Sequence, residues 1–278
     1  MKATFTAAIL AAFLIPASLA AQTSEPPTRF QPSVGQEGKD VVWVPTSPEL
    51  LERMLDMAQV TPQDFVMDLG SGDGRNIIAA AKRGANGLGV EFNPDMVALS
   101  EQLAREAGVS DRAKFVQGDM YAADISKATV LALFLLPHNL QQLQDKFLAL
   151  PPGTRIVMNT FTLPGWEADA TETIANNCSS WCTSLLHIVP ARVAGTWRFD
   201  GGELVLAQEF QKVSGTETAR GVSTTIADGR LRGAEISMVA GGTTYTGRVE
   251  GDRVTGTARS ADGASRAWVA TRSVPAQP

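Results

Sequence analysis

The sequence predicts an α/β domain followed by a small all-β module. Between residues 40 and 190, short apolar runs alternate with segments whose apolar residues recur at helical spacing. This alternation is typical of a parallel sheet with helices on both faces. After Pro190 the helical periodicity ends, and short alternating segments lie between Gly-containing turns. That second pattern favours an antiparallel barrel or sandwich over residues 191–278.

The regular elements of the first domain follow one another closely. Thr46 and Glu49 form a capping box before the first helix. Asn93 followed by Pro94 is a typical N-cap and first helical residue for a later one. In order, we expect helices at 46–58, 75–84, 93–108 and 139–150, and strands at 64–70, 87–92, 113–119, 128–136 and 154–161.

The β module alternates polar and apolar residues in short segments. Residues 203–210 are expected to form a strand, and residues 243–260 form a hairpin. The module carries five aromatic residues that either pack its core or line a cavity for a ligand or partner: Trp197, Phe199, Phe210, Tyr245 and Trp268.

Residues 1–20 have the pattern of a secretory signal peptide. Lys2 precedes 13 apolar-rich residues at 3–15, and Ser18 and Ala20 are small residues suited to cleavage. This predicts an exported, periplasmic protein; the alternative is an uncleaved segment that anchors the chain to a membrane. Residues 21–39 are rich in Pro, Gln, Ser and Gly, which predicts a flexible leader.

The cysteine content leaves the redox state open. Cys178 and Cys182 are close enough to form a small disulfide in an oxidising compartment. In the cytosol they would be free thiols or half of a metal site. Because His138 and His187 are the only histidines, no metal site is expected.

The charge distribution disfavours nucleic acid as a partner. Residues 1–189 contain 13 Lys and Arg against 20 Asp and Glu, and the whole chain has a net charge of −5. A polyanion would be repelled by this first part of the chain.

The stretch "DLGSGDGR", residues 68–75, indicates a bound small molecule. Its glycines follow a G-x-G-x-G spacing, which differs from the dinucleotide fingerprint. A pyrophosphate would be disfavoured beside Asp68 and Asp73. S-adenosylmethionine has no phosphate and carries a sulfonium and an ammonium, so a carboxylate and closely approaching backbone suit it.

Two more acidic residues end the next two expected strands. Glu91 is placed to accept hydrogen bonds from ribose hydroxyls, and Asp119 from an adenine amino group, with Met120 against the ring. Ligands bind at the carboxyl edge of an open parallel sheet, where all these residues are expected to meet. The alternative is that Glu91 and Asp119 are helix caps or solvated charges. The candidate cofactor residues are Asp68, Gly70, Ser71, Gly72, Glu91, Asp119 and Met120.

These motifs carry a family resemblance. "VMDLGSGDGR", "GVEFNP" and "FVQGDM" resemble the first three motifs of class I, seven-stranded, Rossmann-like S-adenosylmethionine-dependent methyltransferases. More narrowly, "VWVPTSPELLERML" and "PPGTRIVMNTFTLPGW" resemble mitochondrial protein-lysine methyltransferases and their uncharacterised bacterial relatives. The resemblance covers about residues 40–190. The export signal and the β module depart from it.

The resemblance implies where several parts of the chain lie. Asp68, Gly70 and Gly72 would hold the methionine part of the cofactor, Glu91 the ribose and Asp119 the adenine. The "VPTSP" stretch at 44–48 would fold over the cofactor. An antiparallel hairpin from about 170 to 190 would supply the sixth and seventh strands, with both cysteines near its tip.

The expected reaction is methylation of a protein lysine or another amine. Methyl transfer relies on positioning and desolvation, so no obligatory acid or base can be identified. His138 and Asn139 are weak catalytic candidates, and a surface histidine beside an N-cap is the plainer interpretation. The alternative function is an exported nucleoside-type binding protein without turnover. The substrate is expected to enter through an apolar groove that favours a membrane-associated protein; it is lined by Trp43, Leu136, Phe161, Leu163 and Trp166.

Overall fold

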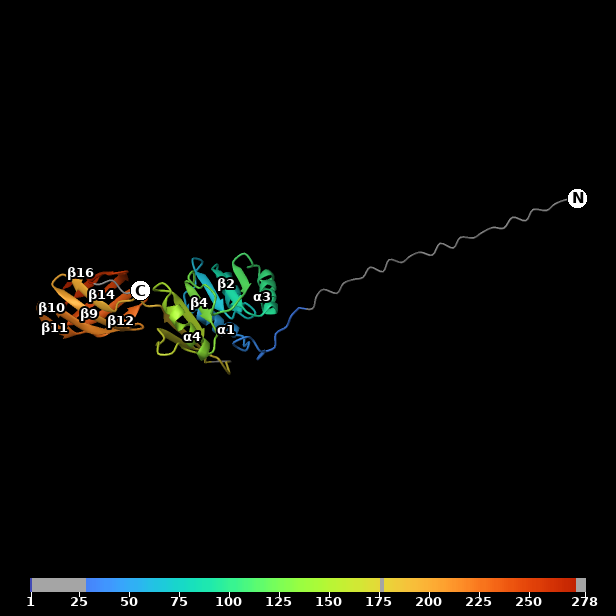
Figure 1. Cartoon of the computed structure of the whole chain (residues 1–278), viewed down its shortest axis with the longest axis horizontal. Helices are drawn as coiled ribbons and strands as arrows, with labels where there is room; N and C mark the ends of the chain where they lie inside the picture. The colour runs from blue at the N-terminus through green and yellow to red at the C-terminus, as the bar shows by residue number, and fades with distance from the viewer. Residues whose placement is uncertain (2–28, 176–177, 274–278) are drawn as a thin grey trace.

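The computed structural model describes residues 1, 29–175 and 178–273. Apart from Met1, the predicted signal peptide lies outside the described residues. The described chain forms an α/β domain and an all-β domain, arranged end to end along the long axis of the molecule (Figure 1). Within this described part, no helix is long and apolar enough to cross a membrane.

The α/β domain contains a mixed sheet of seven strands. Their order across the sheet is β3-β2-β1-β4-β5-β7-β6, with β7 antiparallel to its neighbours β5 and β6. The five parallel strands and the antiparallel hairpin expected from the sequence are therefore confirmed. The strands are β1 (Phe65–Leu69), β2 (Asn86–Glu91), β3 (Ala113–Gln117), β4 (Val130–Leu133), β5 (Arg155–Asn159), β6 (Ala170–Thr173) and β7 (Thr183–Ile188).

Helices cover both faces of this sheet because its strands are apolar on both sides. Val130 and Ala132 of β4 pack with the helices on one face, and Leu131 and Leu133 pack on the other. The first face is covered by α1 (Pro48–Met57), α2 (Arg75–Lys82) and α3 (Pro94–Glu106), and the second by α4 (Pro137–Leu148). Alternate residues of a strand point to opposite faces, so a continuous apolar run fits this double burial.

The all-β domain is a barrel, which decides between the two architectures expected from the sequence. Each of its eight strands pairs with the next along the chain, and β16 pairs with β8 to close the ring. A short ninth strand, β11 (Val222–Thr225), adds to one end of β10. The barrel strands are β8 (Gly195–Phe199), β9 (Gly202–Glu209), β10 (Lys212–Ala219), β12 (Ala227–Arg232), β13 (Glu235–Ala240), β14 (Thr243–Glu250), β15 (Arg253–Arg259) and β16 (Ser265–Arg272).

Four of the five aromatic residues of the β module belong to the barrel core. Trp197, Tyr245 and Trp268 are buried there, and Phe199 packs against them. Phe210 instead lies in the turn between β9 and β10 and packs against the core of the α/β domain. These positions match the core-packing interpretation of the four barrel aromatics.

Phe210 contributes to a tight contact between the two domains. Its ring stacks on Trp166, with 5.7 Å between ring centroids and 4° between planes. Beside this pair, Gln211 Nε2 donates to the carbonyl of Glu167 at 2.7 Å, and Lys212 pairs with the Glu167 carboxylate at 3.0 Å. Stacked aromatic rings and a charged rim give the contact both apolar burial and orientation.

Candidate cofactor site

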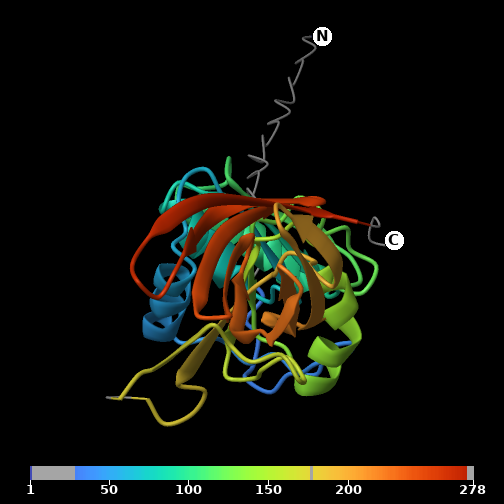
Figure 2. The same ribbon diagram turned by 90° about the vertical axis from the view of Figure 1, so that its left-hand side faces the viewer.

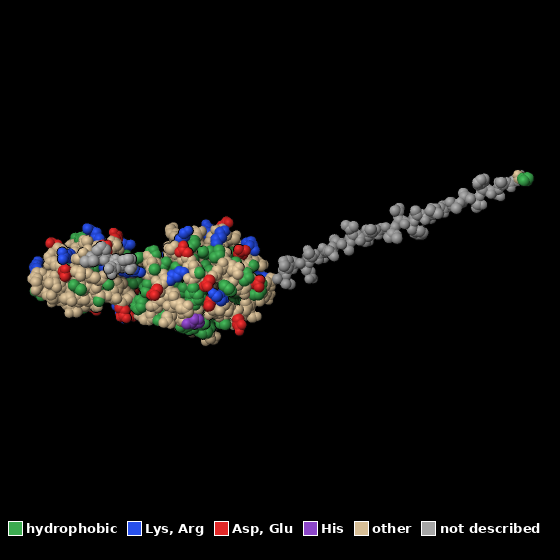
Figure 3. Space-filling model, in the orientation of Figure 1, with side chains coloured by type: hydrophobic (Ala, Val, Ile, Leu, Met, Phe, Trp, Pro, Cys, Tyr) green, Lys and Arg blue, Asp and Glu red, His purple; other side chains and the backbone are tan. Residues whose placement is uncertain are grey.

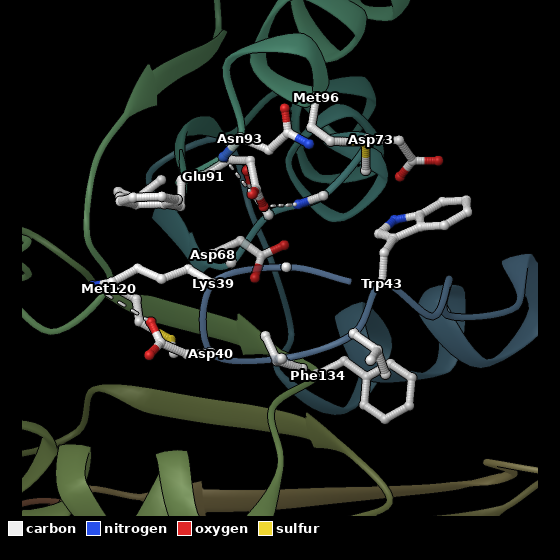
Figure 4. A pocket seen from close by; sticks show the side chains of 18 of the residues that line it. Lys39, Asp40, Trp43, Asp68, Asp73, Glu91, Asn93, Met96, Met120 and Phe134 are labelled. Atoms are coloured by element: carbon white, nitrogen blue, oxygen red, sulfur yellow. Dashed lines mark hydrogen bonds and ion pairs between the residues drawn. The ribbon is translucent and has the colours of Figure 1, made fainter. Parts of the chain in front are cut away.

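A pocket lies at the carboxyl edge of the parallel strands. Residues from the ends of β1 to β4 line it, and a segment at 36–46 covers it (Figure 4). This is the edge where ligands bind in open α/β sheets. All seven candidate cofactor residues of the sequence line this one pocket: Asp68, Gly70, Ser71, Gly72, Glu91, Asp119 and Met120.

The glycine turn between β1 and α2 forms one wall of the pocket. Its backbone requires left-handed φ values of 55° at Gly72 and 77° at Gly74, which glycine adopts without steric cost. A Cβ atom on Gly72 would lie 2.7 Å from the indole nitrogen of Trp43, and one on Gly74 would lie 2.5 Å from the Phe115 ring. Both glycines are therefore needed for conformation and for close packing.

Asp68 is the buried carboxylate of the site. It is 3% exposed, and its one hydrogen-bond donor among the described side chains is Asn76 Nδ2 at 3.0 Å. Burial raises the pKa of Asp68 well above its ordinary value, and the neighbouring Glu91 and Asp73 carboxylates raise it further. A cation bound here would favour the ionised form. Sequence reasoning missed Asn76, although a polar residue on the buried face of α2 was a signal for it.

Glu91 connects the end of β2 to the glycine turn. Its Oε2 accepts from the backbone N–H of Gly72 at 2.8 Å, and its Oε1 accepts from that of Asn93 at 3.0 Å. The side chain thus fixes two loops while it lines the pocket (Figure 4). Each carboxylate oxygen can accept a second hydrogen bond, so this anchoring is compatible with a role toward a ligand hydroxyl.

Asp119 is paired with a lysine that the sequence analysis did not single out. Lys39 Nζ lies 2.5 Å from Asp119 Oδ2 and 5.1 Å from the centre of the Phe92 ring. Asp119 Oδ1 accepts from the backbone N–H of Tyr121 at 2.8 Å. The hydrogen bond from Lys39, followed by that from Tyr121, lowers the pKa of Asp119. Asp119 is therefore ionised and already carries a counter-charge.

The position of Lys39 changes the interpretation of the predicted leader. Within it, Gly35 donates to the carbonyl of Trp43 and Gln36 accepts from the N–H of Trp43, both at 2.9 Å. Residues 36–39 also line the pocket. The described end of the 21–39 segment is thus packed on the domain, in contrast to the flexible leader that its composition predicted.

Asp73 contributes less charge to the pocket than the sequence argument assumed. Its carboxylate pairs with Arg75, with 2.6 Å between Oδ2 and Nη2. Arg75 also donates to the carbonyl of Thr46 at 2.7 Å and lies near the Trp43 ring. In Figure 4 the Asp73 carboxylate points away from Asp68. The unneutralised negative charge therefore centres on Asp68 and Glu91.

Comparisons with known proteins agree with this geometry. The family described as "ANTKMT methyltransferase domain" matches residues 68–170. A protein-lysine N-methyltransferase of Saccharolobus islandicus is 41% identical over 130 residues, covering 46% of this chain and 81% of the relative. The chain belongs to the class I S-adenosylmethionine-dependent methyltransferases.

Other relatives of this methyltransferase match over a smaller share of their length. A lysine N-methyltransferase of Mus musculus that is named for a component of ATP synthase is 35% identical over 130 residues, 46% of this chain and 52% of that protein. The mouse adenine nucleotide translocase lysine N-methyltransferase is 36% identical over 129 residues, 46% of this chain and 56% of that protein. The chain thus spans little more than half of each mouse relative.

A solved structure supports the same fold and cofactor. It is titled as an RNA methyltransferase from Salinibacter ruber in complex with S-adenosyl-L-homocysteine. It is 40% identical, with a TM-score of 0.51, and the match covers 54% of this chain and 96% of that one. The cofactor of this methyltransferase is S-adenosylmethionine. The comparisons give no support to the alternative of a binding protein without turnover.

The residues present suit that cofactor. Ser71 Oγ and Asn76 Oδ1 are buried without hydrogen-bond partners among the described residues. Buried polar atoms are normally paired, so orphans beside a pocket point to ligand contacts. Asp68 and Glu91 add the negative charge that a sulfonium and an ammonium require.

The two weak catalytic candidates lie outside this methyltransferase pocket. His138 is exposed on the first turn of α4, and it is absent from the pocket lining. Asn139 is fully buried; it accepts from the backbone N–H of Leu136 at 3.2 Å and donates to the Tyr121 hydroxyl at 2.8 Å. The helix begins at Pro137, so Asn139 is its third residue and not the expected N-cap. Its contacts are structural.

The predicted substrate groove is only partly present. Trp43 lines the pocket, and Leu136 and Phe161 are partly exposed. Leu163 and Trp166 are each 1% exposed. Trp166 therefore belongs to the domain contact and not to a groove, because its ring is enclosed by Phe210 and His187.

Proposed function

We propose that this methyltransferase transfers a methyl group to a lysine side chain of a protein. The observation that carries the proposal is the 41% identity to a protein-lysine N-methyltransferase over 81% of that protein. The mouse relatives bear the names of lysine methyltransferases as well. The pocket geometry supplies the cofactor half of the reaction at the matching residues.

We propose the following roles in cofactor binding. Asp68 and the turn at Gly70 hold the ammonium end of the methionine moiety. Glu91 accepts from the ribose hydroxyls, and Asp119 with Met120 contacts the adenine. The support is that all of them line one pocket at the ends of consecutive strands.

The proposed chemistry needs little from the protein beyond position and desolvation. A neutral lysine Nζ attacks the methyl carbon in line with the bond to sulfur, and the sulfur keeps the bonding electron pair. The product amine then releases its proton to water. Because His138 lies outside the pocket, no side chain is assigned as the base. Holding the two reactants in line supplies most of the rate.

We propose that the protein is exported and acts on an envelope protein, with an uncleaved membrane anchor as the alternative. Residues 1–20 carry the signal pattern. The disulfide between Cys178 and Cys182, whose Cα atoms are 5.8 Å apart, is the bond expected in an oxidising compartment. N-terminal sequencing of protein from the envelope should start at Ala21. Recovery of an intact Met1 in a soluble cytosolic fraction would contradict export.

The substrate class is tested by labelling. Mature protein is incubated with methyl-labelled cofactor and with separate cytosolic, envelope and nucleic-acid fractions. We expect label in an envelope protein, at lysine after hydrolysis, and none when Asp68→Asn replaces the wild type. Label confined to nucleic acid would favour the activity named for the Salinibacter ruber structure. On the face shown in Figure 3, basic and acidic side chains are interspersed, which favours the protein substrate.

A further inference from the structure

Three aromatic side chains meet beside the cofactor pocket. Phe134 follows β4, Phe161 follows β5, and Trp181 lies in the loop between β6 and β7. The ring centroids of Phe134 and Trp181 are 5.8 Å apart, those of Phe161 and Trp181 5.5 Å, and those of Phe134 and Phe161 6.3 Å. Segments distant in sequence thus build one aromatic surface, which we call the aromatic wall.

The aromatic wall adjoins the pocket and is open to solvent. Phe134 is itself a pocket-lining residue. In Figure 4 it lies on the opposite side of Asp68 from Glu91 and Asn93. Trp181 is 42% exposed, although the other four tryptophans of the chain are more buried. The wall therefore extends from the side of the pocket away from Glu91 outward to the surface.

The disulfide holds Trp181 in an unusual conformation. Cys178 and Cys182 are joined around it, on a hairpin that projects from the body of the molecule (yellow in Figure 2). Trp181 has a φ of 58°, in the left-handed region that bulky residues rarely adopt. Such a conformation persists only where the surroundings enforce it, and it occurs preferentially at ligand-binding sites. A large side chain is thus fixed in an exposed position.

We propose that the aromatic wall binds the substrate lysine and its methylated products, and that the Cys178–Cys182 disulfide positions Trp181 for this contact. The inference rests on the proposed lysine methylation. Aromatic faces attract cations, and they accept the apolar stem of a lysine. Each added methyl group leaves the product amine able to carry its positive charge while making it less hydrated. The affinity of the wall should therefore rise from lysine to trimethyllysine.

A lysine fits the surroundings of the wall better than a nucleotide does. Asp40, Asp68, Glu91 and Asp119 all line the adjoining pocket. Together they attract an ammonium group and repel a phosphate backbone. A base stacked on the same rings would bring its phosphate toward these carboxylates.

The test uses the mature protein saturated with S-adenosylhomocysteine, so that the cofactor site is filled. Calorimetry measures the binding of the amides of Nα-acetyl-lysine and Nα-acetyl-trimethyllysine. We expect the trimethylated probe to bind more tightly. Trp181→Ala should weaken its binding by about 5-fold or more, the scale of a partly exposed cation–π contact. Trp181→Phe should restore most of the affinity, whereas Val222→Ala, on the far barrel strand β11, should change nothing.

The disulfide is tested with the double variant Cys178→Ser/Cys182→Ser. We expect it to weaken trimethyllysine binding as Trp181→Ala does, and to raise KM for the protein substrate with little change in kcat. Its affinity for S-adenosylhomocysteine should equal that of the wild type, which shows that the domain has folded.

Two results would overturn the inference. One is absence of trimethyllysine binding to the wild type, or binding that Trp181→Ala leaves unchanged. The other is binding of a uridine oligonucleotide that Trp181→Ala abolishes, which would assign the wall to RNA. Neither result depends on the labelling experiment: methylation of an envelope lysine with an unaffected Trp181→Ala variant would retain the proposed function and reject the wall alone.

Discussion

Asp68→Asn should weaken S-adenosylmethionine binding by about 10–100-fold and at the same time stabilise the cofactor-free protein. Loss of a hydrogen bond to a charged group costs about 1.5–3 kcal/mol, which corresponds to that change in Kd. The stabilisation follows from burial: Asp68 is 3% exposed, and its ionised form is disfavoured in the folded protein. Asparagine keeps the shape and the acceptor for Asn76 without the charge.

The pH dependence of this effect has a definite sign. The pKa of Asp68 is raised well above 3.8 in the folded protein. Between about 3.8 and that raised pKa, the folded state therefore holds a proton that the unfolded state has lost. Wild-type stability falls as pH rises through this window, and the penalty then stays constant. The Tm of Asp68→Asn should exceed that of the wild type by about 2–4 °C at neutral pH, and by less below the window.

Calorimetry and thermal melts at several pH values check this prediction. Glu101→Gln is a suitable control, because it makes the same change of charge on the exposed surface of α3. Glu91→Gln should weaken cofactor binding without stabilising the fold, since it loosens the contact to Gly72. A wild-type cofactor affinity in Asp68→Asn would show that Asp68 does not contact the cofactor.

Trp166→Ala should cause the largest loss of stability of any variant considered, about 3–5 kcal/mol. Trp166 is 1% exposed and stacks on Phe210 across the domain contact. Its truncation leaves a cavity between the two cores. The loss corresponds to a decrease in Tm on the order of 10 °C for a domain of this size. Differential scanning calorimetry should also show the transitions of the two domains moving apart.

Two variants separate packing from any role toward substrate. Trp166→Phe keeps a ring for the stack and removes an indole N–H that has no hydrogen-bond partner among the described residues. It should therefore cost far less than Trp166→Ala. Trp181→Ala truncates an exposed tryptophan and should leave the Tm nearly unchanged. A decrease in kcat/KM for Trp166→Ala at temperatures where the protein is fully folded would return Trp166 to the substrate groove.

The acidic residues at the strand ends were predictable because two local signals coincide. Asp68, Glu91 and Asp119 each follow an apolar run, and parallel topology brings such positions to one edge. Lys39 was not predictable, because its partner Asp119 lies 80 residues away and the composition around Lys39 indicated a flexible leader. Asn76 had a signal in its spacing on α2, but its contact to Asp68 depends on the turn geometry.

Trp166 shows why aromatic residues are poorly assigned from sequence. A tryptophan in a loop after β5 is equally suited to a substrate groove and to a domain contact. The choice depends on where Phe210 of the barrel lies, and no pattern in either segment links the two. Trp181 is the converse case: it lies in a polar loop, and its exposure results from a disulfide that the sequence left open.

The closing strand of the barrel determines when that domain can form during synthesis. β16 pairs with β8, and Arg272 of β16 donates to the carbonyls of Arg192 and Ala194 in the connection to the α/β domain. A ribosome therefore releases every residue of the α/β domain before the ring can shut. Until β16 emerges, β8 and β15 are open edges that invite pairing with other chains. The nascent barrel is thus a client for chaperones, while the cofactor domain can already be folded.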